Sequence, residues 1–275
     1  MSEQIHSSYR RQKLENPPED WHLTEWSCDK CRDTTWISLG KDADGVDRGV
    51  RRCECLERNA ARARNEDRLP RAQIPAKYEK CRELDSFIFP PEPHPSREHL
   101  QRLVSVIRSY VQNFSPKLPD PRGLLIYGAN GVGKTHLAVA TLRLLLAQGY
   151  EGRFINYQAL LRMIKGGYDQ PFGGSRTDAY DEIAETEILL LDDVGSNRVT
   201  DWVQDTITDL ISQRYDNARA TIVTTNYPLH ADKDCGVHTL ADRIGERAAS
   251  RLREMCRPLA MPALDDYRAK KSIGF

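Results

Sequence analysis

Three short apolar runs, each ending in polar residues, form the strongest pattern along this chain: Gly123–Tyr127, Ile188–Asp193 and Thr221–Asn226. Short runs without polar alternation are typical of strands that are buried on both faces, as in a parallel sheet. Apolar residues recur at helical spacing in Arg97–Phe114 and in Leu240–Met255. The pattern therefore predicts an α/β fold in which helices flank a parallel sheet. One face of the first helix is expected to carry Leu100, Leu103, Val104, Ile107 and Val111.

Composition favours a globular protein that does not enter a membrane. Of the 275 residues, 29% are charged, and 40 basic residues balance 40 acidic ones. The longest apolar stretch, Leu137–Ala147, contains Thr141 and Arg143 and is too short to cross a bilayer. Met1–Asp20 is polar throughout and lacks the pattern of a signal peptide. We therefore expect a cytoplasmic location.

A glycine-rich loop follows the first strand, and Gly128–Thr135 has the pattern G-x-x-x-x-G-K-T of a phosphate-binding P-loop. A predicted strand precedes this loop and a predicted helix, His136–Leu145, follows it, which is the arrangement that the motif requires. Backbone N–H groups and the helix N-terminus would bind the phosphates of ATP or ADP, Lys134 would contact them, and Thr135 would bind Mg²⁺. The nucleotide-binding set comprises Gly128, Asn130, Gly131, Gly133, Lys134, Thr135, His136 and Asp192.

The next two strands end in polar side chains that belong at the same edge of the sheet, because ligands of open parallel sheets bind at the strands' carboxyl ends. Asp192 and Asp193 form a Walker B pattern, in which Asp192 would hold Mg²⁺ and Asp193 would act as the general base. Asn226 ends the third strand and would sense the γ-phosphate. By itself, Asn226 before Tyr227-Pro228 is also an ordinary turn residue.

Arg243, Arg247 and Arg251 recur every four residues in Leu240–Met255, and Gly245 is a candidate break in that helix. Such a stripe is usually solvated or paired with acids. In an oligomeric ATPase, however, one of these arginines could reach the nucleotide of the neighbouring subunit as an arginine finger.

The cysteine spacing predicts a separate N-terminal metal site. Cys28 and Cys31 form one close pair, Cys53 and Cys55 form another, and a predicted hairpin lies between the pairs. Four thiolates can close a tetrahedral zinc site and fold a segment that is too small for its own core. Free cysteines or one disulfide are the alternatives.

The stretch from Ile74 to Phe275 resembles the DnaC/DnaI/IstB group of AAA+ ATPases. The resemblance rests on the P-loop, on Leu-Leu-Leu-Asp-Asp-Val-Gly at 189–195, on Thr-Thr-Asn-Tyr-Pro at 224–228 and on Arg-Ile-Gly-Glu-Arg-Ala-Ala-Ser-Arg-Leu at 243–252. It implies an ATP-dependent loader that acts as an ATP-switched oligomer and delivers a hexameric replicative helicase to single-stranded DNA. A zinc-bearing N-terminal module, as in DnaI-type and phage loaders, would grip the helicase.

The resemblance also assigns roles to residues. Arg247 matches the position of the arginine finger and Arg251 would be a second contact with the γ-phosphate, or the two arginines have these roles the other way round. Asp193 stands where many AAA+ enzymes have Glu, so that slow hydrolysis is expected. Only 24 residues follow Arg251, which are too few for the full C-terminal lid of most AAA+ proteins.

Single-stranded DNA would follow the stretch between the P-loop and the Walker B pattern. The sequence predicts that this stretch is rich in loops. Charged and aromatic residues alternate there as they do on strand-binding surfaces, although a solvated loop explains the same pattern. The candidates are Arg162, Lys165, Tyr168, Phe172 and Arg176.

Two other functions remain open. An IstB-like transposition ATPase would assemble on duplex DNA, and a nucleotide-gated adaptor would bind ATP with little hydrolysis. The zinc-binding module favours the loader, because a compact separate domain suits the capture of a partner. In the expected organisation, residues 1–20 form a disordered tail, 21–70 the zinc-binding module that contacts the helicase, 71–121 a linker and helix, and 122–275 the ATPase domain.

Overall fold

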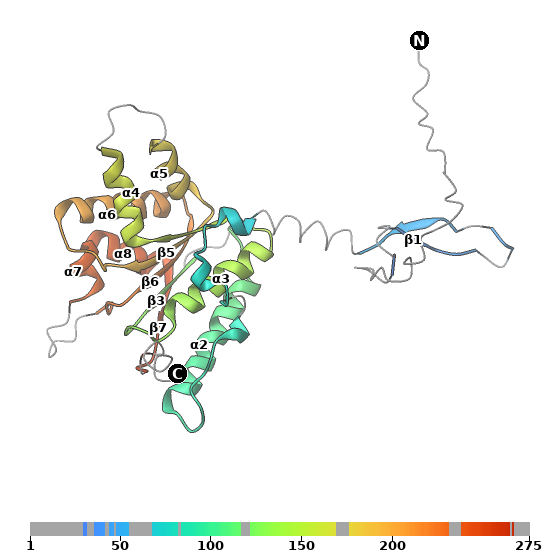
Figure 1. Ribbon diagram of the computed structural model, residues 1–275, viewed down its shortest axis with the longest axis horizontal. Coiled ribbons are helices and arrows are strands. Elements are labelled where there is room, and N and C mark those ends of the chain that lie inside the picture. The colour runs from blue at the N-terminus through green and yellow to red at the C-terminus, as the bar shows by residue number, and fades with distance from the viewer. Residues whose placement is uncertain are drawn as a thin grey trace, which may run out of the picture. The chain divides into compact units, whose positions relative to one another are not determined.

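The computed structural model describes residues 30–31, 36–41, 44–46, 48–54, 68–81, 84–116, 122–168, 176–230, 238–264 and 266. The chain divides into two compact units, Met1–Ala60 and Ala61–Phe275 (Figure 1). Strands β1 (Trp36–Ser38) and β2 (Val50–Arg52) of the first unit pair antiparallel, which confirms the predicted hairpin. Beside it, Cys31 and Cys53 are buried in a cluster that Ile37 packs against. Cys28 and Cys55 lie outside the described residues.

The second unit is built on a five-stranded sheet in the order β4-β5-β6-β3-β7, and each of its strand pairs is parallel. The predicted strands are confirmed as β3 (Gly123–Tyr127), β5 (Ile188–Val194) and β6 (Ala220–Thr225). The edge strands β4 (Gly152–Asn156) and β7 (Cys256–Ala260) lacked a continuous apolar run and were not predicted. An edge position also tolerates Pro258.

Helices cover both faces of this sheet (Figure 1). On one face lies α3 (Lys134–Ala147), against which α2 (Pro95–Gln112) packs. The other face is covered by α4 (Tyr157–Tyr168), α6 (Asp201–Asp216) and α8 (Glu246–Met255). Side chains alternate along the strands, so that Leu124 and Ile126 join the first core and Leu125 joins the second.

The remaining elements are two short 3₁₀ turns, η2 (Ala76–Tyr78) and η3 (Leu84–Ser86), and the helices α5 (Arg176–Glu185) and α7 (Leu240–Ile244). The five apolar residues predicted for one face of α2 are all buried. Gly245, at a φ of 85°, separates α7 from α8 and so confirms the predicted break. Within the described residues, no helix has both the length and the apolar character needed to cross a membrane.

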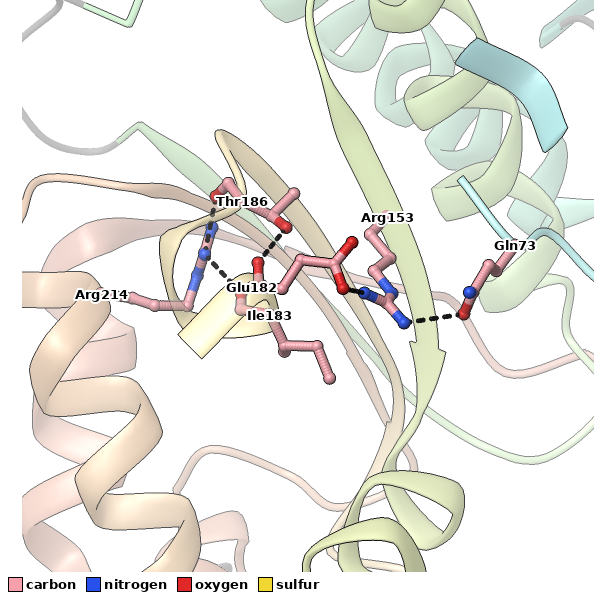
Figure 2. A network of polar contacts seen from close by, with 6 residues as sticks. All are labelled: Gln73, Arg153, Glu182, Ile183, Thr186 and Arg214. Carbon is pink, nitrogen blue, oxygen red and sulfur yellow. Dashed lines mark hydrogen bonds and ion pairs between the residues drawn. The ribbon is translucent and has the colours of Figure 1, made fainter. Parts of the chain in front are cut away.

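Two arginines fix α5 to the sheet and to the segment that precedes α2 (Figure 2). Arg153 on β4 pairs with Glu182 at 2.7 Å and donates to the Gln73 side chain at 3.0 Å. The edge of β4 is covered at the same place, because the N–H of Phe154 donates to the carbonyl of Ala72 at 2.8 Å. A chain of polar contacts therefore joins α5, β4 and residues 72–73.

Arg214 is fully buried on α6 and holds the other side of α5. Its guanidinium donates to the carbonyls of Ile183 at 3.2 Å and Thr186 at 2.8 Å, where α5 ends (Figure 2), and to the carbonyl of Ala184 between them at 2.9 Å. It also donates to the Thr221 hydroxyl and to the Ala220 carbonyl on β6. The last carbonyls of a helix have no partner within the helix, so that Arg214 acts as the C-terminal cap of α5. Burial lowers the pKa of Arg214 to about 9.

We expect Arg214→Met to destabilise the second unit by roughly 3 kcal/mol, because each buried acceptor left without a donor costs about 1–3 kcal/mol. Urea unfolding followed by circular dichroism measures this loss. Arg102→Met is the matched control, since Arg102 is 76% exposed in a surface ion pair with Glu98 and such pairs contribute about 0–1 kcal/mol. Equal stability of the two variants would show that α5 does not need its cap.

Candidate functional site

The polar side chains predicted to act together lie at the carboxyl ends of neighbouring strands, which we call the sheet edge. Because β6 pairs with both β3 and β5, the ends of these three strands are neighbours. The glycine loop follows β3, Asp192 and Asp193 lie within the last residues of β5, and Asn226 follows β6 directly. The sheet order therefore brings together three motifs that are separated by many residues in the sequence.

The glycine loop is curled in a way that favours residues without a side chain. Gly128, Gly131 and Gly133 have φ angles of 142°, 74° and 97°. A Cβ atom on Gly133 would also lie 2.6 Å from the Phe87 ring. Inside the curl, the Lys134 ammonium donates to the carbonyls of Gly128 at 2.9 Å and Ala129 at 2.6 Å. Such a loop at a helix N-terminus suits phosphate groups.

Asp192 connects the glycine-loop helix to the sheet. The residue is 4% exposed, and one carboxylate oxygen accepts hydrogen bonds from the hydroxyls of Thr135 and Thr224, each at 2.7 Å. Thr135 and Asp192 thus place two hard oxygen ligands beside each other, which is the donor chemistry that Mg²⁺ prefers. These two residues fit a magnesium ion bound together with a nucleotide's phosphates.

Asp193 is turned out of the strand toward Asn226. The register of β5 against β6 shifts between Leu191 and Val194, and Asp193 has a φ of 62°. Its backbone N–H donates to the Thr224 hydroxyl at 2.9 Å, and its carboxylate accepts from the Asn226 amide at 2.8 Å. A bulge of this kind redirects a side chain at the cost of backbone strain, and such strain concentrates at functional sites.

Burial raises the pKa of Asp193, and the neighbouring charge of Asp192 adds to this effect. Hydrogen bonds from Ser196 and Asn226 and the positive charge of Lys134 oppose the rise. A carboxylate with a raised pKa binds a proton more readily than an exposed one, while the opposing donors help to keep it ionised. This balance suits a general base.

The arginines of the predicted stripe have two different environments. Arg247 is exposed on α8. It lines a surface hollow of about 420 Å³ with Arg251, Tyr215 and Glu254, and the Arg251 guanidinium lies 5.6 Å from the centre of the Tyr215 ring. Arg243 lies on α7 and contacts the chain's own loops instead. The hollow thus presents two guanidinium groups at the surface.

His136 and four of the five candidate DNA contacts lie on helices. The His136 ring is half-buried, with Nε2 3.0 Å from the Ser86 hydroxyl. Arg162 and Lys165 are exposed one turn apart on α4, so the prediction of a loop-rich stretch was wrong for them. Tyr168 ends α4 and Arg176 begins α5, with side chains outside the described residues. Phe172 also lies outside those residues.

Thr224 and Ser196 are two contributors that the sequence did not reveal. Both contact the Asp192–Asp193 pair, Thr224 through its hydroxyl and Ser196 through its hydrogen bond to Asp193. Hydroxyl residues in an otherwise apolar strand were a usable signal for Thr224, because a buried hydroxyl requires a hydrogen-bond partner. No group of three or more His, Cys, Asp or Glu side chains suited to a metal occurs in the described part of the chain.

Residues 50–268 match the family of IstB-like ATP-binding proteins. Among curated proteins, the chain is 26% identical over 163 residues to the replicative helicase loader DnaI of Bacillus subtilis, covering 59% of this chain and 50% of DnaI. It is 30% identical over 103 residues to a Mycobacterium tuberculosis protein described as an ATP-binding protein in an insertion sequence, covering 38% and 40% of the two chains. The chain thus spans half or less of these relatives.

Solved structures show the same fold. A crystal structure of the DnaC helicase loader is 32% identical with a TM-score of 0.57, covering 68% of this chain and all of that one. DnaA of Aquifex aeolicus with bound AMPPCP is 19% identical with a TM-score of 0.51, covering 73% and 56% of the two chains. The second unit therefore has the five-stranded parallel sheet and flanking helices of AAA+ P-loop ATPases.

We expect Thr224→Val to weaken nucleotide binding in Mg²⁺ by about 10-fold, as is typical when a group that orients a metal ligand is lost. Valine keeps the shape but removes the hydroxyl that donates to Asp192. Titration with a fluorescent ATP analogue, once in Mg²⁺ and once in EDTA, measures the effect, and affinity in EDTA should not change. Thr141→Val is the control, because this buried hydroxyl donates to the Leu137 carbonyl within α3. Unchanged affinity in Mg²⁺ would contradict the role of Thr224.

Proposed function

The chain belongs to the family of IstB-like ATP-binding proteins, and from this premise we propose that it loads a hexameric replicative helicase onto single-stranded DNA as an ATP-switched oligomer. The proposal rests above all on one observation: Lys134, Thr135 and Asp192 lie together at the carboxyl ends of the strands. The similarity to DnaC, which extends over the whole of that structure, supports the choice of a loader.

In this proposal, the glycine loop and Lys134 bind the phosphates of ATP, and Thr135 and Asp192 hold Mg²⁺. The ion neutralises phosphate charge when it is bound. Asp193, held by the amide of Asn226, accepts a proton from the attacking water. The side chain of Asp is shorter than that of Glu, so that hydrolysis is slow.

The proposed oligomer places α8 of one copy against the nucleotide of the next. Arg247 and Arg251 line a hollow at the surface, and there they would stabilise negative charge on the neighbour's γ-phosphate. Arg247 is the finger in this arrangement and Arg251 the second contact, because Arg247 is the more exposed of the two.

The first unit is proposed as the part that grips the helicase. Its hairpin region carries four large apolar side chains that are 45–62% exposed: Trp36, Leu39, Val46 and Val50. Several large apolar side chains exposed on one small unit favour a protein interaction surface. Cys31 and Cys53 are buried side by side in one cluster, and with Cys28 and Cys55 they would hold the zinc that fixes this unit.

Single-stranded DNA is proposed to bind along α4 and the segment after it. Arg162 and Lys165 are exposed there, and Tyr168, Phe172 and Arg176 follow in the sequence. Cations bind the DNA backbone and aromatic rings stack on bases, so that such binding does not depend on sequence and weakens with salt.

A second candidate is a transposition ATPase that assembles on duplex DNA. The similarity to ATP-binding proteins of insertion sequences in Mycobacterium tuberculosis and Pseudomonas fluorescens favours it. An adaptor that binds ATP with little hydrolysis would use the same residues, and Asp193→Ala separates it from the enzyme, because the adaptor's function would survive that change.

Light scattering after size exclusion tests the loader proposal. The chain mixed with the replicative helicase of its genome or host should form a stoichiometric complex that responds to ATP and single-stranded DNA. Lys134→Ala should lose the response to ATP, because the ammonium at the phosphate loop is removed. ATP-dependent filaments on duplex DNA without a helicase complex would favour the transposition ATPase instead.

Metal analysis tests the zinc proposal. Freshly purified protein should contain one zinc per chain, and Cys31→Ser should lose most of it, because a structural zinc site needs its four ligands. Cys81→Ser should keep its zinc, since Cys81 lies in the second unit's core. Metal-free wild-type protein would refute the site.

A further inference from the structure

Arg243 connects two turns that border the nucleotide site. Its Nε donates to the carbonyl of Gly195 at 2.9 Å, and one terminal nitrogen donates to the carbonyl of Asn197. Its guanidinium carbon lies 4.9 Å from the centre of the Tyr227 ring. Residues 195–197 follow β5 and Tyr227 follows β6, so that a single side chain binds both turns.

Both turns lie next in sequence to residues of the nucleotide site, Asp193 and Asn226. Ser196, between the two carbonyls that Arg243 binds, hydrogen bonds to Asp193, and Tyr227 is the neighbour of Asn226. The packing is tight, because a Cβ on Gly195 would lie 3.0 Å from atoms of both Arg243 and Tyr227. A movement of Asp193 or Asn226 would therefore change the acceptors and the ring that Arg243 contacts.

Arg243 is itself a residue of α7, and further hydrogen bonds hold that helix in place. That helix begins with a capping box in which Thr239 and Asp242 exchange hydrogen bonds. The N–H of Leu240 donates to the carbonyl of Pro228 at 2.8 Å, which attaches the same helix to the turn after β6 a second time. A short helix held at both ends would move with these turns.

Gly245 links α7 to α8, the helix that presents Arg247 and Arg251. It has a φ of 85°, and the nearest atom to a Cβ placed there is 4.0 Å away. Glycine in open space can change its backbone angles with little steric cost. A shift of α7 can therefore reach the start of α8 through this link, while Ala248, Ala249, Leu252 and Met255 keep the helix packed in the core.

We infer that Arg243 is a positioning residue that couples ATP in the chain's own site to the placement of Arg247 and Arg251 on α8. The inference rests on the proposed function, in which those arginines serve the neighbouring copy. Arginine suits this role because its planar fork binds two carbonyls while its face stacks on a ring, which a lysine cannot do. ATP bound in one subunit then prepares that subunit to complete the site of the next.

Hydrogen exchange of residues 246–255 tests the coupling within one chain. The full chain carries Arg247→Ala and Arg251→Ala, so that contacts with a neighbour's nucleotide do not contribute, and exchange is measured with and without a non-hydrolysable ATP analogue and Mg²⁺. With Arg243 intact, the analogue should change exchange in α8 by about 5-fold or more, the lower end of typical coupling between sites. Arg243→Gln and Arg243→Lys should both abolish the change, while the analogue's affinity stays within about 3-fold.

The matched control is Arg253→Gln, which removes an arginine of α8 that pairs with Glu246 and does not contact the turns. It should keep the response. If Arg243→Gln also keeps it, or if the analogue leaves α8 unchanged when Arg243 is present, the coupling is overturned. A purely structural role would instead lower thermal stability and nucleotide affinity together in Arg243→Gln, and this too would overturn the inference. Failure of the Arg243-intact chain to bind the analogue would remove the proposed function itself.

Discussion

The buried carboxylate of Asp192 holds the nucleotide site together. A nearly inaccessible charge is costly unless donors surround it, and here the donors are hydroxyls from α3 and β6. Each of these hydroxyls is in place only when β3, β5 and β6 pair in the observed order. The strand order therefore places Thr135 beside Asp192. In turn, the negative charge of Asp192 requires these hydroxyl donors and so stabilises the arrangement of the strand ends.

Local patterns were sufficient to predict most of this edge. The G-x-x-x-x-G-K-T loop needs its glycines for backbone angles that other residues avoid, so Gly128–Thr135 could be interpreted without a fold. Three strands were predicted because their side chains are buried on both faces. The outer strands β4 and β7 were missed, because a strand at the side of a sheet needs fewer apolar residues. Residues 72–73 cover β4 through contacts that the periodicity of the sequence does not reveal.

Contacts between distant segments were not predictable in the same way. Thr224 lies 32 residues from Asp192 in sequence and Arg214 caps a helix 30 residues before it, so that only the folded chain shows these partners. The spacing of Arg243, Arg247 and Arg251 suggested three equivalent positions. The break at Gly245 divides them: Arg243 faces inward to the chain's own turns, whereas the other two face the surface hollow.

This division bears on how one core can serve different tasks. A helicase loader and an ATP-binding protein of an insertion sequence both resemble parts of this chain, at 26% and 30% identity, so that the resemblance alone does not distinguish the two functions. In the proposed function, what the protein acts on depends on other surfaces, here the hairpin unit and the exposed residues of α4. Arg153 and Arg214 fasten α5 to β4 and β6. Both arginines act near the start of these strands, at the opposite end from Asp192 and Asn226, so that α5 is held to the sheet by contacts that do not involve the nucleotide site.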